Sequence, residues 1–83
     1  PVGTMVELDT AEVGLVVNLP SNPINFHRPQ VKLVVDRTGN PVEDGDIVDL
    51  DERYRGGGKY VRTIERTMDS REHGVSITKF FFG

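Results

Sequence analysis

Apolar and polar residues alternate along much of this chain, and this period-2 pattern is typical of strands that lay one face on a core. Two such stretches, residues 4–9 and 13–17, flank a polar segment whose composition predicts a tight turn. The sequence therefore predicts an opening β-hairpin over its first seventeen residues. The side chains expected on the core face of this hairpin are those of Thr4, Val6, Leu8, Val13, Leu15 and Val17.

A proline-containing connection follows the hairpin. Residues 18–23 include two prolines, each of which lacks a backbone donor and favours extended geometry in the residue before it, so a surface loop is expected. Residues 24–28 do not predict a single structure. In one arrangement Ile24 and Phe26 cover the open end of a barrel.

Two further strands are predicted in the middle of the chain, over residues 30–36 and 47–50. Between them, the Thr-Gly-Asn-Pro sequence at 38–41 predicts a chain reversal, because Gly and Asn tolerate positive φ and Pro fixes the exit. A second turn is expected at 44–46. The expected faces are Val31, Leu33 and Val35 opposite Lys32 and Val34, and Ile47 and Asp49 opposite Val48 and Leu50.

The last predicted strand covers residues 60–66, after three consecutive glycines at 56–58 that interrupt regular structure. Its alternation places Tyr60, Arg62 and Ile64 on one face, although Val61, Ile64 and Met68 also fit helical spacing. Five short strands at hairpin spacing favour a mostly β fold, namely a small, five-stranded, partly open SH3-like barrel.

The C-terminal residues predict short helices. Residues 68–74 fit one helical turn that ends at Gly74, and Ser76 is placed to cap a second short helix. We therefore expect one domain, with the barrel over residues 1–67 and a helical C-terminal appendage over 68–83. At least one phenylalanine of the tail is expected to contact a neighbouring domain, since three adjacent rings cannot all face one way; these are Phe80, Phe81 and Phe82.

Composition narrows the function classes. The 83 residues contain no cysteine, which removes disulfides and thiolate ligands and favours a cytoplasmic location. No apolar run approaches the roughly 20 residues of a membrane-spanning helix. A net charge of −3 makes a dedicated nucleic-acid binder an unfavoured interpretation. The chain does not begin with Met, and we expect it to be cut from a longer polypeptide.

One basic segment is a candidate for ligand binding. Residues 53–62 follow an acidic run over 43–52 and combine cations with two tyrosines and three glycines, a composition that suits phosphates and stacked bases. The alternative is a mobile loop whose cations offset the neighbouring acids. The possible contacts to an anionic ligand are Arg53, Arg55, Lys59 and Arg62.

No catalytic, cofactor-binding or metal-binding residue is predicted. A metal-dependent phosphodiesterase needs several His and Asp ligands, whereas His27 and His73 stand alone and fit solvated or capping roles. The acidic run lacks the ligand spacing of a calcium loop. The three serines, Ser21, Ser70 and Ser76, lie in turns or caps without an evident base.

Five ordered segments resemble the region that follows the catalytic core in bacterial HD-GYP proteins. The resemblance implies a parent that is a metal-dependent phosphodiesterase acting on cyclic di-GMP. Neither the His-Asp pair nor the Gly-Tyr-Pro triplet of that family occurs here, so none of its catalytic residues has a counterpart in this chain. The segments are Pro1-x-Gly3-Thr4-x-Val6-x-Leu8, Glu12-x-Gly14-x-Val16-Val17, Arg28-Pro29-x-Val31-x-Leu33-x-Val35, residues 36–42 and residues 47–50.

Three hypotheses follow. The first is a non-catalytic C-terminal accessory module that contacts the preceding catalytic domain of the same polypeptide or a protein partner. The second is an independent module that binds a nucleotide or single-stranded nucleic acid through residues 53–62. The third is an oligomerisation domain. The sequence does not predict an oligomeric state.

Overall fold

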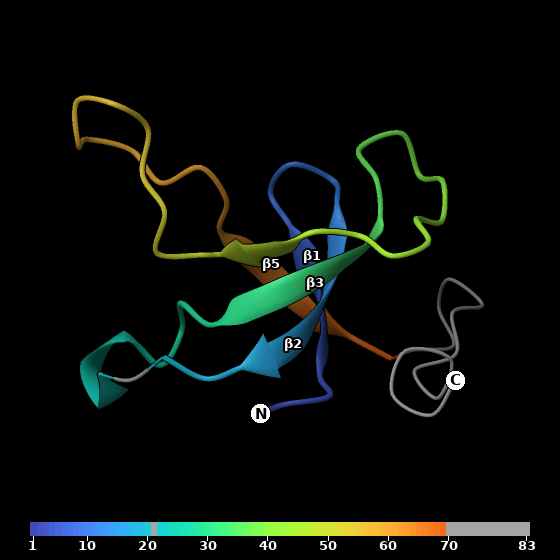
Figure 1. The fold of residues 1–83 in the computed structure, drawn as a ribbon, viewed down its shortest axis with the longest axis horizontal. Helices are drawn as coiled ribbons and strands as arrows, with labels where there is room; N and C mark the ends of the chain where they lie inside the picture. The colour runs from blue at the N-terminus through green and yellow to red at the C-terminus, as the bar shows by residue number, and fades with distance from the viewer. Residues whose placement is uncertain (21, 70–83) are drawn as a thin grey trace.

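Five antiparallel strands form one sheet in the computed structural model, which describes residues 1–20 and 22–69. The sheet order is β4-β3-β2-β1-β5 (Figure 1). The described residues include one 3-10 turn, η1 (Pro23–Asn25), and no α-helix, so the mostly β prediction is confirmed. The strands are β1 (Met5–Leu8), β2 (Val13–Asn18), β3 (Gln30–Val35), β4 (Ile47–Asp49) and β5 (Ile64–Met68).

The opening hairpin is formed, but the prediction that its two strands share one core face is wrong. Val6 and Leu8 lie in one buried cluster, whereas Val13 and Leu15 lie in another. Met5 of β1 pairs with Leu15 of β2, and the turn is closed by the Leu8 N–H, which donates to the Glu12 carbonyl at 2.8 Å. Ala11 takes a positive φ of 74° in this turn. The turn after β3 is also confirmed, because the Asp36 carboxylate accepts from the Thr38 and Asn40 backbone N–H groups at 2.9 Å each.

The main core collects side chains from all five strands, so the sheet curls into a barrel-like form. In Figure 1 the sheet doubles back on itself, with β5 lying behind β3. Leu50, directly after β4, is fully buried in this cluster. The cluster contains Val6, Leu8, Val16, Val31 and Leu50, with the partly buried Leu33, Val48 and Ile64 against it.

A second buried cluster was not expected from the alternation. It contains Val34 and Val35 together, although adjacent strand residues should face opposite ways. The reason is a register shift: Val13 pairs with Val35, but Gly14 pairs with Leu33, which leaves Val34 as the extra residue of a β-bulge. The prediction that Val35 shares a face with Val31 and Leu33 is therefore wrong. This second cluster consists of Met5, Val13, Leu15, Val34, Val35 and Met68.

Two other bulges change predicted positions. Asn18 pairs with Gln30 directly after the pair of Val16 and Val31, so Val17 is an extra residue and is only half-buried. A third shift lies between β1 and β5. Bulges bend a strand and re-aim its side chains, which is how short strands curl round a small core.

The fifth strand and the 24–28 segment also differ from expectation. Strand β5 begins at Ile64 rather than at residue 60, and its last residue is Met68, one residue past the expected end of the barrel. Ile24 and Phe26 are 80% and 75% exposed, so they do not cover the core. The helical turn expected from residue 68 does not begin there, because Met68 is the last residue of β5 and residue 69 is not helical; residues 70–83 of the expected helices lie outside the described residues.

Candidate functional site

A long hairpin over residues 50–63 connects β4 to β5, the two outermost strands of the sheet. Its two arms pair irregularly: the Tyr54 N–H donates to the Lys59 carbonyl at 2.9 Å, and the Val61 N–H donates to the Glu52 carbonyl at 3.1 Å. Gly56 and Gly57 take φ values of 101° and 78° at the tip, a geometry that glycine adopts readily. The tip projects away from the sheet at the upper left of Figure 1.

Arg28 closes the gap between the two outermost strands. Its Nη1 donates to the Leu50 carbonyl at 3.0 Å and to the Arg62 carbonyl at 2.7 Å, and its Nη2 donates to Thr63 Oγ1 at 3.2 Å. Leu50 directly follows β4 and Thr63 directly precedes β5. One guanidinium therefore hydrogen-bonds residues at the ends of both strands. The residue is 8% exposed, and its Nε has no hydrogen-bond partner among the described residues.

Tyr60 attaches the hairpin to this arginine. The Arg28 Cζ atom lies 3.5 Å from the centroid of the Tyr60 ring, and the Arg53 Cζ atom lies 4.5 Å from it. Arg53 Nη2 also donates to the Tyr60 hydroxyl at 2.8 Å. Two guanidinium groups thus contact one aromatic ring, an arrangement favoured by the ring quadrupole. Tyr60 therefore connects the base of the hairpin to the arginine that bonds both outer strands.

Arg62 forms a largely buried ion pair next to this group. Its Nε lies 2.8 Å from Glu12 Oε1, and Thr10 Oγ1 donates to the same carboxylate oxygen. Burial alone would raise the pKa of Glu12, but the hydrogen bonds from Arg62 and Thr10, with the charges of Arg62 and Arg37, outweigh it. The pKa of Glu12 therefore lies below its ordinary value.

This lowered pKa predicts a specific pH dependence. The Glu12 contribution to the free energy of unfolding is present above pH 4.5, the ordinary glutamate pKa, and is lost as the pH falls through the lower folded-state value. Urea denaturation of wild type and Glu12→Gln should show the variant less stable at pH 7. The difference in free energy of unfolding between the two proteins should disappear as the pH falls below 4.5. A gap that stays constant from pH 7 to pH 3 would contradict this assignment.

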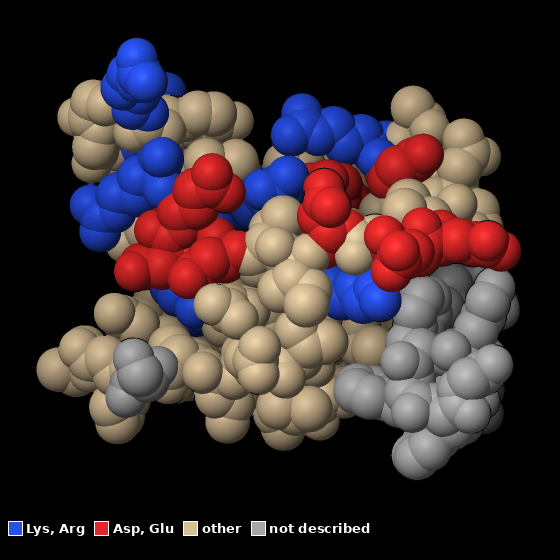
Figure 2. Space-filling model, in the orientation of Figure 1, with Lys and Arg blue, Asp and Glu red and all other residues tan. Residues whose placement is uncertain are grey.

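The structure divides the four cations expected to contact an anionic ligand. Arg53 is held on Tyr60, and Arg62 is held by Glu12 with Glu52 at 3.7 Å. Arg55 and Lys59 are exposed at the hairpin, and their side chains bond no other described residue. In Figure 2, Lys and Arg side chains gather at the upper left, where the hairpin projects.

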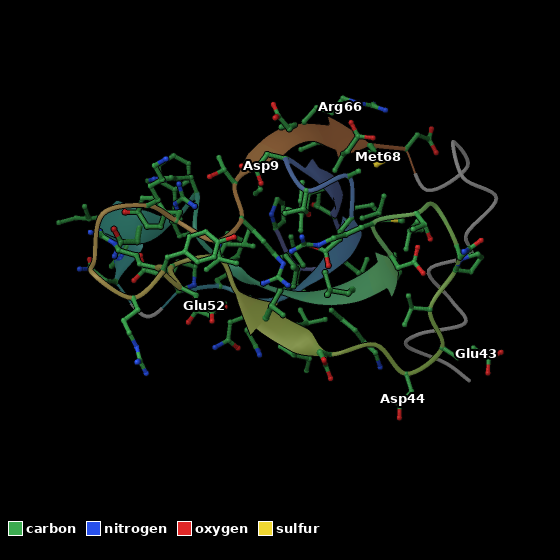
Figure 3. All side chains as sticks on the ribbon, turned by 90° about the horizontal axis from the view of Figure 1, so that it is seen from above. Asp9, Glu43, Asp44, Glu52, Arg66 and Met68 are labelled. Carbon is green, nitrogen blue, oxygen red and sulfur yellow. The ribbon has the colours of Figure 1, made fainter. Side chains whose placement is uncertain are left out.

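Other sequence candidates are not brought together. The acidic run is spread along the molecule, since Glu52 lies at the opposite end from Glu43 and Asp44 in Figure 3. No group of three His, Cys, Asp or Glu side chains that could hold a metal ion occurs within residues 1–20 and 22–69. The His27 ring makes an edge-to-face contact with Phe26, with 5.5 Å between centroids. The remaining candidates, Ser21, Ser70, His73, Ser76, Phe80, Phe81 and Phe82, lie outside the described residues.

A pocket of about 290 Å³ opens beside Arg28. It lies between the loop that carries η1 and the ends of β3 and β4. Sequence reasoning missed both the pocket and the role of Arg28. The sequence did contain one signal of the role of Arg28. The fifteen residues 13–27 include no Lys, Arg, Asp or Glu, and Arg28 is the first charged residue after them. The pocket is lined by Leu19, Pro20, Asn22, Asn25, Arg28, Gln30, Asp49 and Asp51.

Comparison with models of known protein families identifies a family for this chain. A family model described as a KOW domain associated with HD domain matches residues 5–55, which is more than half of the chain. The matched span contains β1 to β4, Arg28 and the first arm of the hairpin. No curated protein and no solved structure matches the chain. Among the described residues, no helix is long and apolar enough to cross a membrane.

Proposed function

This chain belongs to the family of KOW domains associated with an HD domain, and we propose that it is the non-catalytic C-terminal accessory module of an HD-GYP-type metal-dependent phosphohydrolase in cyclic di-GMP signalling. The family match over residues 5–55 supports the part of the proposal that makes this chain an accessory module of an HD-domain protein. The finer assignment to HD-GYP proteins and cyclic di-GMP rests on the ordered resemblance of five segments between Pro1 and Leu50. Fold alone does not define a function, so the partner has to be argued from the surface.

An exposed apolar loop supports a role in protein contacts. Leu19, Ile24 and Phe26 are 59%, 80% and 75% exposed, and they lie within eight residues of each other around η1. Single exposed apolar residues are ordinary, but a group of them in an uncharged segment is typical of an interaction site. The lower left of the surface in Figure 2 is free of Lys, Arg, Asp and Glu. We call residues 19–26 the apolar loop.

The proposed partner is the preceding catalytic domain of the same polypeptide. In this proposal the fold is an SH3-like barrel, extended from the expected residues 1–67 to include Met68 of β5. The residues after it form an appendage, and the module functions in the cytoplasm. Phe80, Phe81 and Phe82 are proposed as further apolar contacts to that domain.

Activity and assembly assays test the proposal together. The catalytic domain should hydrolyse cyclic di-GMP with added manganese or iron, and this chain alone should not. A mixture of the two should sediment as a one-to-one complex. Hydrolysis by the isolated chain would contradict the non-catalytic assignment. A chain that forms only its own dimer would support the oligomerisation hypothesis instead.

A second candidate function is favoured by one observation, the exposed positions of Arg55 and Lys59 beside the glycine tip. Two free cations with flexible backbone N–H groups are suited to a phosphate group. In this alternative, Arg53 and Arg62 would have to leave Tyr60 and Glu12 to contribute. Titration with cyclic di-GMP and with a short RNA tests the alternative, and the absence of any response at millimolar ligand would exclude it.

A further inference from the structure

The pocket beside Arg28 offers unused hydrogen-bond acceptors. Asp49 Oδ1 accepts from the Asp51 backbone N–H at 2.9 Å, which leaves its second oxygen free. The Asp51 carboxylate bonds no other described residue, and both aspartates are exposed. Arg28 also lines the pocket, but its hydrogen bonds go to the Leu50 and Arg62 carbonyls and to Thr63, so one guanidinium faces two carboxylates that it does not hydrogen-bond. The rim of the pocket is therefore acidic and open to a donor.

The remaining residues that line the pocket are both polar and apolar. Asn25 and Gln30 contribute side-chain amides, and Leu19 and Pro20 connect the pocket to the apolar loop. At about 290 Å³ the pocket is at the lower limit for small-molecule sites, which span about 300–1,000 Å³. This volume suits a single inserted side chain better than a nucleotide.

We propose that this pocket receives a basic side chain of the HD domain, with flanking apolar residues of that domain packing on the apolar loop. The inference rests on the proposed function and specifies the chemistry of the partner surface. The inference rests on charge complementarity: the pocket has two carboxylates against one guanidinium, neither carboxylate forms an ion pair with a described residue, and both border an uncharged surface with three exposed apolar side chains, Leu19, Ile24 and Phe26. In Figure 2 the uncharged surface lies directly below an acidic group on the left side. A guanidinium presents several donors in a fixed fork and matches carboxylates well.

The first experiment uses the chain alone. Titration of the ¹⁵N-labelled chain with butylguanidinium should shift the amide signals of Asn25, Gln30, Asp49 and Asp51 saturably. Butanesulfonate, which has the same apolar stem and the opposite charge, should not shift them. The double variant Asp49→Asn with Asp51→Asn should weaken butylguanidinium binding about fivefold, the upper range for exposed charge pairs. The Asn oxygen at position 49 can still accept from the residue 51 N–H, so the turn is retained.

A matched control removes the same charge elsewhere. Glu43→Gln with Asp44→Asn lies at the other end of the acidic run (Figure 3) and should leave binding unchanged. Equal weakening by both double variants would overturn the inference, because it would indicate a general charge effect rather than a pocket.

The second experiment uses the HD domain and separates this inference from the proposed function. The wild-type chain should bind the domain more tightly than the Asp49→Asn, Asp51→Asn variant, and added salt should reduce the difference. Equal affinity of the two chains would overturn the pocket inference and leave the accessory role standing. No binding of the domain by the wild-type chain would overturn the proposed function itself.

Discussion

Replacing Arg28 by methionine is expected to lower the free energy of unfolding by about 3 kcal/mol, because buried carbonyls lose charged donors worth about 1.5–3 kcal/mol each, partly offset by removal of a buried charge. The lost bonds go to the Leu50 and Arg62 carbonyls. These are contacts that close the barrel between β4 and β5. For a small domain with about 5–15 kcal/mol of total stability, such a loss is large. Urea denaturation measures it.

Two further variants separate the role of shape from that of charge. Arg28→Lys keeps the charge but lacks the planar fork, so it should recover less than half of the loss. Arg55→Met removes an exposed arginine from the 50–63 hairpin and should change stability by less than about 0.5 kcal/mol. An Arg28→Met protein as stable as wild type would show that the guanidinium does not hold the barrel closed.

Replacing Gly14 by alanine is expected to cost about 2–3 kcal/mol, within the usual range for overpacking. An added Cβ would lie 2.7 Å from Val31 Cγ2 and 2.9 Å from Val31 Cβ. Val31 is fully buried in the main core, and a new rotamer cannot move its Cβ. The β2 and β3 backbones would therefore have to separate where they are paired.

A matched glycine gives the control. Gly58 at the hairpin tip has no atom within 4 Å of an added Cβ and does not take a positive φ. Gly58→Ala should therefore alter the free energy of unfolding by less than about 0.5 kcal/mol. Thermal unfolding of both variants measures the contrast, and similar destabilisation by the two would refute the close-packing explanation.

The strands and turns were readable from the sequence because each depends on neighbouring residues. Alternation located β1, β2 and β3, and the Gly-Asn-Pro sequence located the turn at 38–41. Alternation failed at Val34 because a bulge depends on the pairing of β3 with β2, which a single strand does not encode. The predicted start of β5 at residue 60 was wrong for a similar reason, since residue 60 contacts Arg28, which is distant in the sequence. Tyr60 is held by two arginines rather than by a continuous ladder.

The candidate site was harder to predict because its parts are distant in the sequence. Arg28 contacts residues 22 to 35 positions away, and Arg62 pairs with Glu12 across 50 positions. Composition identified a basic segment at 53–62, but it did not reveal that the segment forms part of a hairpin or that Arg53 and Arg62 are used within the fold. Likewise, the uncharged run over residues 13–27 was visible, but its meaning required knowledge of which side chains are exposed.

The central claim is that this module binds an HD catalytic domain through an apolar surface. Calorimetric titration of the HD-GYP catalytic domain with the chain at several temperatures tests it most directly. We predict one-to-one binding with a negative heat-capacity change, the marker of apolar burial. Phe26→Ser should weaken the binding, since Phe26 is exposed in the free chain. Absence of binding at about 100 μM, which would place the affinity weaker than about −5.5 kcal/mol, would contradict the account.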